Sequence, residues 1–431
     1  MSPAIKCLIL LAVIALFFVT EIIPLAITAI GGAVACGLLG LIPAKQVFSD
    51  LSNSTVVLFA GMFVVGAAMF YTGLAQAIGE KVVHIFGTGE NSLMLVGTIL
   101  SSVLSNTGTC ACLMPVALGI CAASKNPASR QLMPLAFACG WGGIITLVGT
   151  PPNIIGSGAL TAAGLPGFSF FEFAWIGIPL SVAGILYMLL IGKYLLPKAE
   201  LDADQEIEQE IEATTHDKKK QVISGVILLA CVTVMALNLK FISLEMTAII
   251  GALVCVLTGC LIEKQAYSSI DWVTIFLFAG MMPVSTAMDK TGAGKLIANW
   301  AVGLMGGEPT PLIVTIVLFS ISCFLTQFMS NTASAALLCP IGIAIAKQLN
   351  ADPKAVVMAI AVAASCAFAT PVGTPPCTLV LGPGGYKFMD YVKCGTGLVL
   401  LCRRGNMIRM KVLTAYNMLY FLAPGRMKSV L

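Results

Sequence analysis

Residues 92–123 read SLMLVGTILSSVLSNTGTCACLMPVALGICAA, an uncharged stretch with the polar triplet Ser-Asn-Thr (105–107) at its centre. About 13 residues lie on each side of the triplet. An α-helix rises about 1.5 Å per residue, so each arm covers about 20 Å, whereas the hydrocarbon core of a bilayer is about 30 Å thick. Neither arm can cross it. The stretch therefore predicts a re-entrant hairpin over 92–123, with its polar tip near the middle of the membrane.

The next apolar stretch, 131–160, is long enough to cross a membrane but contains Gly-Thr-Pro-Pro at 149–152. A proline removes a backbone N–H donor, clashes with the preceding turn and restricts the residue before it, here Thr150. A second helix can start near Pro152, because proline is favoured in the first turn. We therefore expect a broken helix over 131–160, interrupted at 148–152, with its unpaired backbone groups facing the hairpin tip.

Both motifs occur a second time. Ser-Asn-Thr returns at 330–332, an offset of 225, and Gly-Thr-Pro-Pro returns at 373–376, an offset of 224. The pentapeptide Leu-Phe-Ala-Gly-Met at 58–62 returns at 277–281, an offset of 219. Nearly constant spacing over so many positions indicates duplication of one unit. The corresponding elements predicted in the second copy are a re-entrant hairpin over 311–347 and a broken helix over 354–382.

The composition identifies the environment of these elements. The chain has 431 residues, of which 58% are hydrophobic and 10% charged, whereas a soluble domain carries about 25% charged residues. Long apolar runs separate the few charges, so we expect an all-α polytopic protein of the cell membrane. Most of the 15 cysteines lie inside apolar runs, where they act as small hydrophobic residues. No basic patch with interleaved aromatic residues occurs, which excludes nucleic acid as a partner.

The repeat and the loop charges predict the division of the chain. The run that follows Lys6 lacks a signal-peptide cleavage pattern and is expected to be a retained first helix. If the marginal element near 74–87 crosses the membrane, the loop lysines and arginines fall on one side, so the linker is cytoplasmic and the second copy inverted. The predicted parts are an N-terminal transmembrane helix (1–24), repeat 1 (25–197), a cytoplasmic linker (198–220), repeat 2 (221–402) and an atypical C-terminal tail (403–431).

The tail departs from the repeat. The last helix of the first copy runs from about Trp175 to Leu196, but its counterpart starts near Tyr391 and meets Arg403 and Arg404 after about ten apolar residues. Each charge at a helix centre costs about 2.5–3.5 kcal/mol on insertion scales. Our hypothesis for residues 403–431 is a frameshifted or truncated gene product, and the alternative is a divergent amphipathic tail.

Each copy thus offers a hairpin tip and a helix break that face one another. Carbonyl groups freed by the break, together with serine and asparagine oxygens, suit a hard monovalent cation, and the amino ends of half-helices suit carboxylates. No charged residue lies within 132–171, 309–346 or 355–386. An anion bound there would be balanced by helix dipoles and co-bound cations. A single motif of either kind is more often packing or a kink, but both motifs, twice and in register, indicate a binding site.

At these residues the chain resembles the divalent anion–sodium symporter family, whose members carry dicarboxylates, citrate or sulfate. The resemblance covers about residues 5–400 and rests on the paired Ser-Asn-Thr and Gly-Thr-Pro-Pro motifs. It implies two inverted repeats with re-entrant hairpins and broken helices. It also implies a homodimer of scaffold domains, each with a transport domain that moves like an elevator.

The resemblance also assigns site residues, with two or more sodium ions as coupling ions. The first Gly-Thr-Pro-Pro continues with Asn153, as in the family, but the second continues with Cys377, where similar proteins have asparagine. This departure concerns the second sodium site and the coupling stoichiometry. The implied sodium ligands are Ser101, Ser105, Asn106 and Gly149 in the first site, and Thr326, Ser330, Asn331 and Gly373 in the second. The implied contacts of the substrate carboxylates are Asn106, Thr107 and Thr150 on one side, and Asn331, Thr332, Thr374 and Pro375 on the other.

The predicted function is secondary active transport, namely sodium-coupled symport of a small divalent anion, a C4-dicarboxylate such as succinate. The alternatives are a dicarboxylate or tricarboxylate exchanger and a proton-coupled permease for citrate, tartrate or sulfate. An enzyme is disfavoured, because the two histidines, His84 and His216, lie outside the motifs and no metalloprotease or phosphate-binding pattern occurs. A channel is disfavoured because the motifs predict an occluding site rather than a pore ring.

Overall fold

The structure is a computed structural model that describes residues 1–86, 90–124, 126–197, 217–237, 239, 241–304 and 310–403. All regular secondary structure in these residues is helical, which confirms the predicted all-α fold. Several segments are long and apolar enough to cross a membrane on their own, so the chain is a polytopic membrane protein. These segments are Pro3–Thr20, Ala44–Tyr71, Ala174–Leu195, Lys218–Leu237 and Trp272–Thr291.

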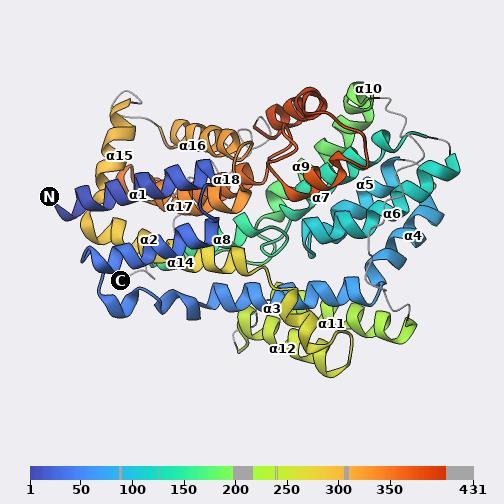
Figure 1. Ribbon diagram of the computed structural model, residues 1–431, viewed down its shortest axis with the longest axis horizontal. Coiled ribbons are helices and arrows are strands. Elements are labelled where there is room, and N and C mark those ends of the chain that lie inside the picture. Colours follow the sequence, from blue (N-terminus) through green and yellow to red (C-terminus); the bar gives the residue numbers. More distant parts are fainter. Residues whose placement is uncertain are drawn as a thin grey trace, which may run out of the picture.

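The helices follow one another as two sets in the same order (Figure 1). The first set comprises α1 (Pro3–Thr20), α2 (Leu25–Leu38), η1 (Ala44–Gln46), η2 (Ser49–Ser52), α3 (Ser54–Tyr71), α4 (Leu74–Phe86), α5 (Glu90–Ser101), α6 (Asn106–Ser124), η3 (Ala128–Arg130), α7 (Leu132–Gly143), α8 (Pro151–Ala162), α9 (Ala174–Tyr187), the π-helical η4 (Met188–Gly192) and α10 (Lys193–Leu195). The second set comprises α11 (Lys218–Leu237), α12 (Leu244–Leu257), α13 (Glu263–Ser268), α14 (Trp272–Thr291), α15 (Ala293–Leu304), α16 (Pro311–Leu325), α17 (Asn331–Gln348), α18 (Pro353–Ala364), α19 (Pro375–Leu381) and a last helix over 388–403.

The helix pairs α5–α6 and α16–α17 occupy the two stretches predicted as hairpins, and in Figure 1 they flank α7, α8 and α18. The pairs α7–α8 and α18–α19 occupy the two stretches predicted as broken helices. Most of the predicted linker (198–216) and nearly all of the predicted tail (404–431) lie outside the described residues. The division of the chain into parts therefore stays a prediction.

The first helix break is longer than the predicted 148–152, because α7 already ends at Gly143. The loop that follows finds backbone partners outside the helix. The Leu147 N–H donates to the Phe170 carbonyl oxygen at 2.9 Å, and the Thr146 hydroxyl donates to a carbonyl oxygen of the α5–α6 tip. These bonds compensate for the lost helical ones, so the helix ends well before its prolines.

The two sets of helices interlock through small residues. Helix α2 packs against α14, and α12 packs against α3. At the first crossing, a Cβ added to Gly280 would lie 2.5 Å from the carbonyl carbon of Ala29. At the second, a Cβ added to Gly61 would lie 2.6 Å from the carbonyl carbon of Ala248. Gly61 and Gly280 hold the same place in the repeated pentapeptide. The pentapeptide therefore marks two equivalent close helix crossings, a packing mode typical of membrane proteins.

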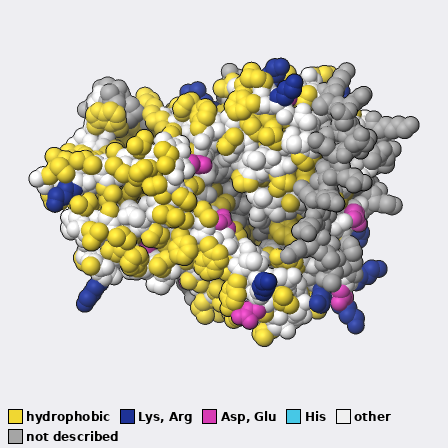
Figure 2. Space-filling view, viewed as in Figure 1, with side chains coloured by type: hydrophobic (Ala, Val, Ile, Leu, Met, Phe, Trp, Pro, Cys, Tyr) yellow, Lys and Arg dark blue, Asp and Glu magenta, His cyan; other side chains and the backbone are white. Residues whose placement is uncertain are grey.

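The outer face of the first helices is apolar. Large hydrophobic side chains of α1 are exposed at roughly helical spacing, namely Ile5, Ile9, Val13, Leu16 and Val19. Figure 2 shows hydrophobic side chains covering the surface over α1 and α2, with lysine and arginine side chains near the margins of this face. Such a surface suits lipid chains, with the charges in the headgroup or water layers.

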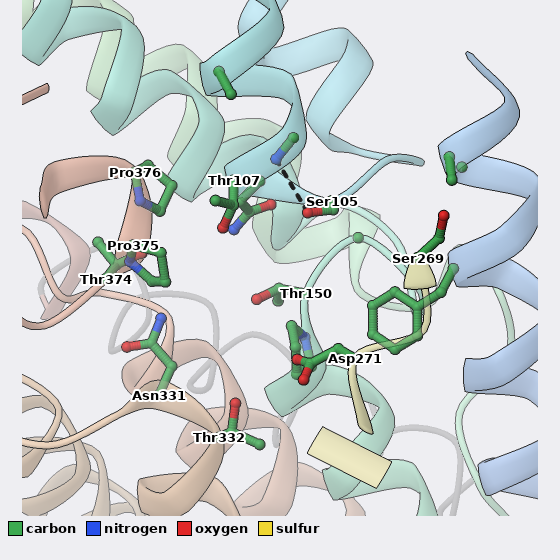
Figure 3. A pocket seen from close by; sticks show the side chains of 18 of the residues that line it. Ser105, Thr107, Thr150, Ser269, Asp271, Asn331, Thr332, Thr374, Pro375 and Pro376 are labelled. Atoms are coloured by element: carbon green, nitrogen blue, oxygen red, sulfur yellow. Dashed lines mark hydrogen bonds between the residues drawn. The ribbon is translucent and has the colours of Figure 1, made fainter. Parts of the chain in front are cut away.

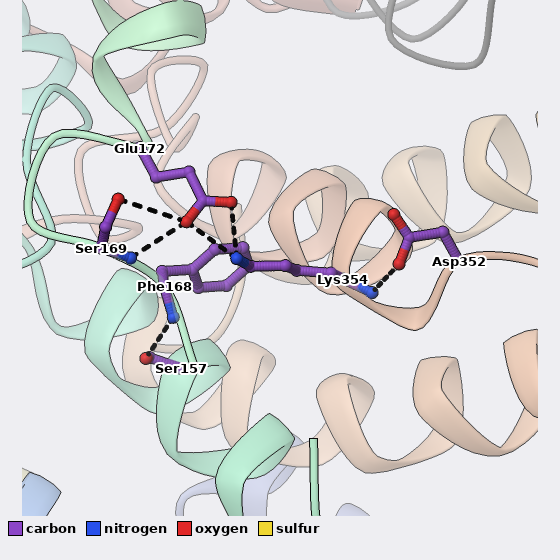
Figure 4. Close-up of polar contacts among 6 residues, drawn as sticks. All are labelled: Ser157, Phe168, Ser169, Glu172, Asp352 and Lys354. Atoms are coloured by element: carbon purple, nitrogen blue, oxygen red, sulfur yellow. Dashed lines mark hydrogen bonds and ion pairs between the residues drawn. The ribbon is translucent and has the colours of Figure 1, made fainter. Parts of the chain in front are cut away.

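An ion pair joins the two sets away from the hairpin tips (Figure 4). Lys354, in the first turn of α18, lies 2.8 Å from a carboxylate oxygen of Glu172, in the loop before α9. The Ser169 N–H also donates to this carboxylate at 2.9 Å. The Lys354 ammonium lies 5.3 Å from the centre of the Phe168 ring. Both charged side chains are about 30% exposed, so the pair is partly shielded from water.

We expect Lys354→Met to lower the free energy of unfolding by about 1 kcal/mol, because it removes the charge and leaves Glu172 only its Ser169 contacts. The apolar stem over Phe168 is kept. The matched control is Lys347→Met, since the Lys347–Asp289 pair is 3.9 Å long and more exposed. Thermal unfolding in detergent should show a lower midpoint for the first variant and almost none of this change for the second. Equal midpoints in the two variants would contradict the assigned role.

Candidate functional site

The Ser-Asn-Thr motif starts a helix in each copy. Ser330 is the N-cap of α17, and its hydroxyl oxygen accepts a hydrogen bond from the Ala333 N–H at 3.1 Å. Ser105 accepts from the Gly108 N–H at 3.2 Å at the start of α6. An N-cap satisfies one of the free N–H groups of the first turn and so fixes where the helix begins. Capping is thus a role of both serines in addition to the predicted sodium contacts.

The Gly-Thr-Pro-Pro motif starts the second half of each broken helix. Thr150 and Thr374 precede α8 and α19 with an extended backbone (φ −145° in both), and prolines occupy the first turn. Proline suits this turn because it needs no hydrogen-bond partner for an N–H. Each motif therefore makes its threonine the N-cap and starts the half-helix at the proline that follows.

The glycine of each motif lies against the hairpin tip of its own copy. A Cβ on Gly149 would lie 2.5 Å from the Gly143 carbonyl oxygen and 2.9 Å from that of Ser102. A Cβ on Gly373 would lie 2.7 Å from the Thr326 carbonyl oxygen. Real Cβ atoms do not approach a carbonyl oxygen so closely. Glycine is thus required where the break passes the tip, and the contact brings carbonyl groups of both segments together.

The asparagine of the Ser-Asn-Thr motif joins the tip to the broken helix. With its amide nitrogen facing the surrounding acceptors, Asn106 donates toward the Gly149 carbonyl at 3.0 Å and lies 2.7 Å from the Ser101 hydroxyl. Ser101 in turn donates to the Cys139 carbonyl at 2.8 Å. Oxygen atoms from three segments therefore surround one amide. In the second copy the amide nitrogen of Asn331 lies 2.8 Å from the Gly373 carbonyl, 3.0 Å from the Ala364 carbonyl and 2.7 Å from the Thr326 hydroxyl.

Both tips and both breaks open into one cavity with a volume of about 1200 Å³. Figure 3 shows Thr107 and Thr150 of the first copy across the cavity from Asn331 and Thr374 of the second. Two predicted residues do not line it: Ser101 and Thr326 are fully buried behind the tips. The predicted residues that line it are Ser105, Asn106, Thr107, Gly149, Thr150, Ser330, Asn331, Thr332, Gly373, Thr374 and Pro375.

The charges of the cavity are few and negative. Among the described residues that line it, Glu21 and Asp271 are charged, and no lysine or arginine occurs. Asp271 is the N-cap of α14, where its carboxylate accepts from the Thr274 N–H at 3.1 Å. Figure 3 places Asp271 and Ser269 to one side of the tips. Neither motif predicts Glu21 or Asp271 as lining residues, because they are single positions at helix ends and not part of the repeated motifs.

Several helices begin at the cavity. Helices α6, α8 and α17 begin among its lining residues, and so does the short α19. The amino end of a helix carries a partial positive charge and free N–H groups. An anion at the centre would therefore meet several positive dipole ends together with the hydroxyls of the motif threonines.

Comparison with known proteins agrees with this architecture. The profile of a citrate transporter family matches residues 15–335 and 233–429. An uncharacterized transporter of Haemophilus influenzae is 33% identical, over 91% of this chain and 88% of its own. The sodium-dependent dicarboxylate transporter SdcS of Staphylococcus saprophyticus is 25% identical, over 95% and 84%. The crystal structure of the Alcanivorax borkumensis YdaH transporter, described as having an unusual topology, shares the fold with a TM-score of 0.67, 14% identity and coverage of 97% and 99%.

The fold and these relatives define the class of the protein: it is a multi-pass membrane transporter, not an enzyme. More specifically, the chain belongs to the citrate transporter family, in agreement with the resemblance seen in its motifs. The dicarboxylate relatives support the divalent anion–sodium symporter assignment.

Proposed function

We propose that this transporter is a sodium-coupled symporter of a C4-dicarboxylate such as succinate. The observation that supports it most is the convergence of several helix starts and motif hydroxyls on a cavity with no lysine or arginine among its described lining residues. Dipole ends and N–H groups suit carboxylates. They do not neutralise two full negative charges, so a dianion in this cavity needs co-bound cations.

The proposed substrate contacts follow from the lining. One carboxylate meets Asn106, Thr107 and Thr150, and the other meets the equivalent groups of the second copy, Asn331, Thr332, Thr374 and Pro375. The two half-sites come from different copies of the repeat, which is the arrangement of many secondary transporters. A substrate with a carboxylate at each end of a short chain matches two facing half-sites.

The proposed sodium sites lie beside the asparagines. In the first site, the Ser101 hydroxyl and the Gly149 carbonyl lie around the Asn106 amide, next to Ser105. Neutral oxygens of an unwound helix are the ligands by which transporters of this kind hold sodium. The residue types present therefore fit the ion, and in this structure the Asn106 amide nitrogen bonds to the two oxygens that would hold it. The second site contains the equivalent groups of Thr326, Ser330, Asn331 and Gly373.

Uptake of radiolabelled succinate into proteoliposomes tests the proposal. We expect uptake to rise about tenfold or more when an inward sodium gradient replaces potassium, because without bound sodium the dianion must enter an uncompensated cavity. Uptake that ignores sodium but requires preloaded dicarboxylate would identify an exchanger instead. Uptake driven by an inward proton gradient would identify a proton-coupled permease. Citrate, tartrate and sulfate, added as competitors, establish the substrate class.

A further inference from the structure

The two helix breaks are held by different side chains. In the first, Asn153 is fully buried and its amide nitrogen donates to the Thr146 carbonyl at 2.8 Å and, more weakly, to the Gly143 carbonyl at 3.4 Å. The equivalent residue of the second copy, at an offset of 224, is Cys377, which is also fully buried. A thiol is a weak donor with one hydrogen and cannot tie two carbonyls. The second break therefore needs another source of hydrogen bonds.

That source is Gln327, at the tip of the second hairpin. Its amide nitrogen donates to the Cys366 carbonyl at 3.0 Å and to the Cys323 carbonyl at 2.8 Å. Its amide oxygen accepts from the Ala369 N–H at 3.0 Å. The equivalent residue of the first copy is Ser102, whose hydroxyl donates within its own turn, to the Ile99 carbonyl at 2.7 Å. Each break is thus held by one buried side-chain amide. In the first copy this amide belongs to the broken helix, and in the second copy it belongs to the hairpin.

The Gln327 amide also takes the place of a backbone hydrogen bond. In the first copy the Ile144 N–H donates directly to the Trp141 carbonyl at 3.2 Å. At the offset of 225, which also relates Cys139 to Ala364, the same two groups are the Ala369 N–H and the Cys366 carbonyl. These are the groups between which the glutamine amide is inserted. An amide can bridge them because it carries both a donor and an acceptor. The second break is thereby widened, and α18 ends at Ala364.

A chain of hydrogen bonds leads to the proposed second sodium site from the Gln327 backbone and from Thr370, the residue after the Ala369 N–H that the Gln327 side chain holds. The Thr370 hydroxyl donates to the Gln327 backbone carbonyl at 2.6 Å, and the Gly373 N–H donates to the Thr370 hydroxyl oxygen at 3.2 Å. The Gly373 carbonyl lies 2.8 Å from the Asn331 amide nitrogen. The place of the Gly373 carbonyl therefore depends on how the tip holds the break.

We infer that Gln327 is a positioning residue that replaces the missing asparagine at Cys377 and sets the geometry of the second sodium site. The inference rests on the proposed function, because it concerns the sodium ligands of that transporter. This role of Gln327 means that the two sodium sites differ in the segment that holds them. The first is held from within its broken helix, and the second is held by the hairpin that closes over it.

The test exchanges the amide between the two positions. Gln327→Ser is expected to raise the sodium concentration for half-maximal succinate uptake at least about fivefold, with the maximal rate per folded protein largely kept at saturating sodium. The double variant Gln327→Ser/Cys377→Asn reproduces the first-copy pair and should return this concentration to within about twofold of the parent protein. A purely structural role would lower the amount of folded protein and leave the sodium curve in place. An unchanged sodium curve in Gln327→Ser, or no recovery in the double variant, would overturn the inference.

The reverse exchange in the first copy is the matched control. Asn153→Cys should raise the sodium concentration for half-maximal succinate uptake. The double variant Ser102→Gln/Asn153→Cys should return this concentration toward that of the parent protein. If Gln327→Ser yields too little folded protein for uptake, the double variant should still be recovered as a monodisperse species, and its absence counts against the inference. The parent protein separates the two proposals. If the parent shows no sodium-dependent uptake, the proposed function fails, whereas a sodium-dependent parent with an indifferent Gln327→Ser variant refutes only the role of Gln327.

Discussion

Replacement of Asn331 by alanine is expected to abolish sodium-dependent uptake, and Asn106→Ala is expected to do the same. Each asparagine side chain contacts the hairpin, the first half of the broken helix and the glycine of the break at once. Alanine removes three polar contacts in a half-buried site and also the proposed carboxylate and sodium contacts. At about 1–3 kcal/mol for each polar partner left unsatisfied, a loss of at least about 100-fold in uptake is expected.

The measurement is the initial rate of succinate uptake in proteoliposomes with an inward sodium gradient, normalised to the folded protein. Asn299→Ala is the matched control, because Asn299 lies exposed on α15 and outside the cavity lining. It should transport like the parent protein. Insertion and monodispersity of the two site variants should be retained, since capping by Ser105 and Ser330 does not depend on the asparagine side chain. Sodium-dependent uptake retained by either variant contradicts its assigned role.

The sequence predicts much of this architecture because its signals are local and occur twice. The hairpin is predicted by a charge-free stretch in which neither arm is long enough to cross the membrane. The break is predicted by a proline pair inside an apolar stretch. Helices begin at Asn106 and Pro151, as expected for a serine cap and for proline in a first turn. The repeat then carries each inference to the second copy. The tips and breaks of both copies lie around a single cavity.

Other features could not be read from the sequence, since they depend on contacts between distant segments. Glu21 and Asp271 reach the cavity because α1 and α2 pack against α14, and α14 packs against α17 of the second hairpin. Gln327 looks like any polar residue at a hairpin tip, and only the folded chain shows its amide between the Cys366 carbonyl and the Ala369 N–H. Cys377 stands out as a departure in the sequence, but the side chain that replaces the asparagine is 50 residues away. Compensation at such a distance is a property of packing.

The repeated pentapeptide also has one feature that the sequence reveals and one that only the structure explains. Its recurrence reveals a duplication, but not why glycine stands at its fourth position. The structure gives the reason, because Gly61 and Gly280 let two helix backbones come into contact.

We expect Gly280→Leu, and equally Gly61→Leu, to prevent recovery of folded protein. The obstructing atoms belong to the backbone of Ala29 and Ala248 and cannot rotate away as a side chain would, so two helices must separate.

Over-packing of this kind costs about 3 kcal/mol or more, and the interlock of the two sets would be lost at one of its two crossings. Size-exclusion chromatography and thermal unfolding in detergent measure the effect. Gly31→Leu, two residues beyond Ala29 and on another face of α2, is the matched control, because a Cβ there meets nothing within 4 Å and the residue is exposed. It adds the same side chain to the lipid-facing surface and should leave the unfolding midpoint nearly unchanged. A monodisperse Gly280→Leu protein with the midpoint of the Gly31→Leu protein would show that α2 and α14 do not need their close approach. The two equivalent crossings, of α2 with α14 and of α3 with α12, could then not be what holds the two sets of helices together.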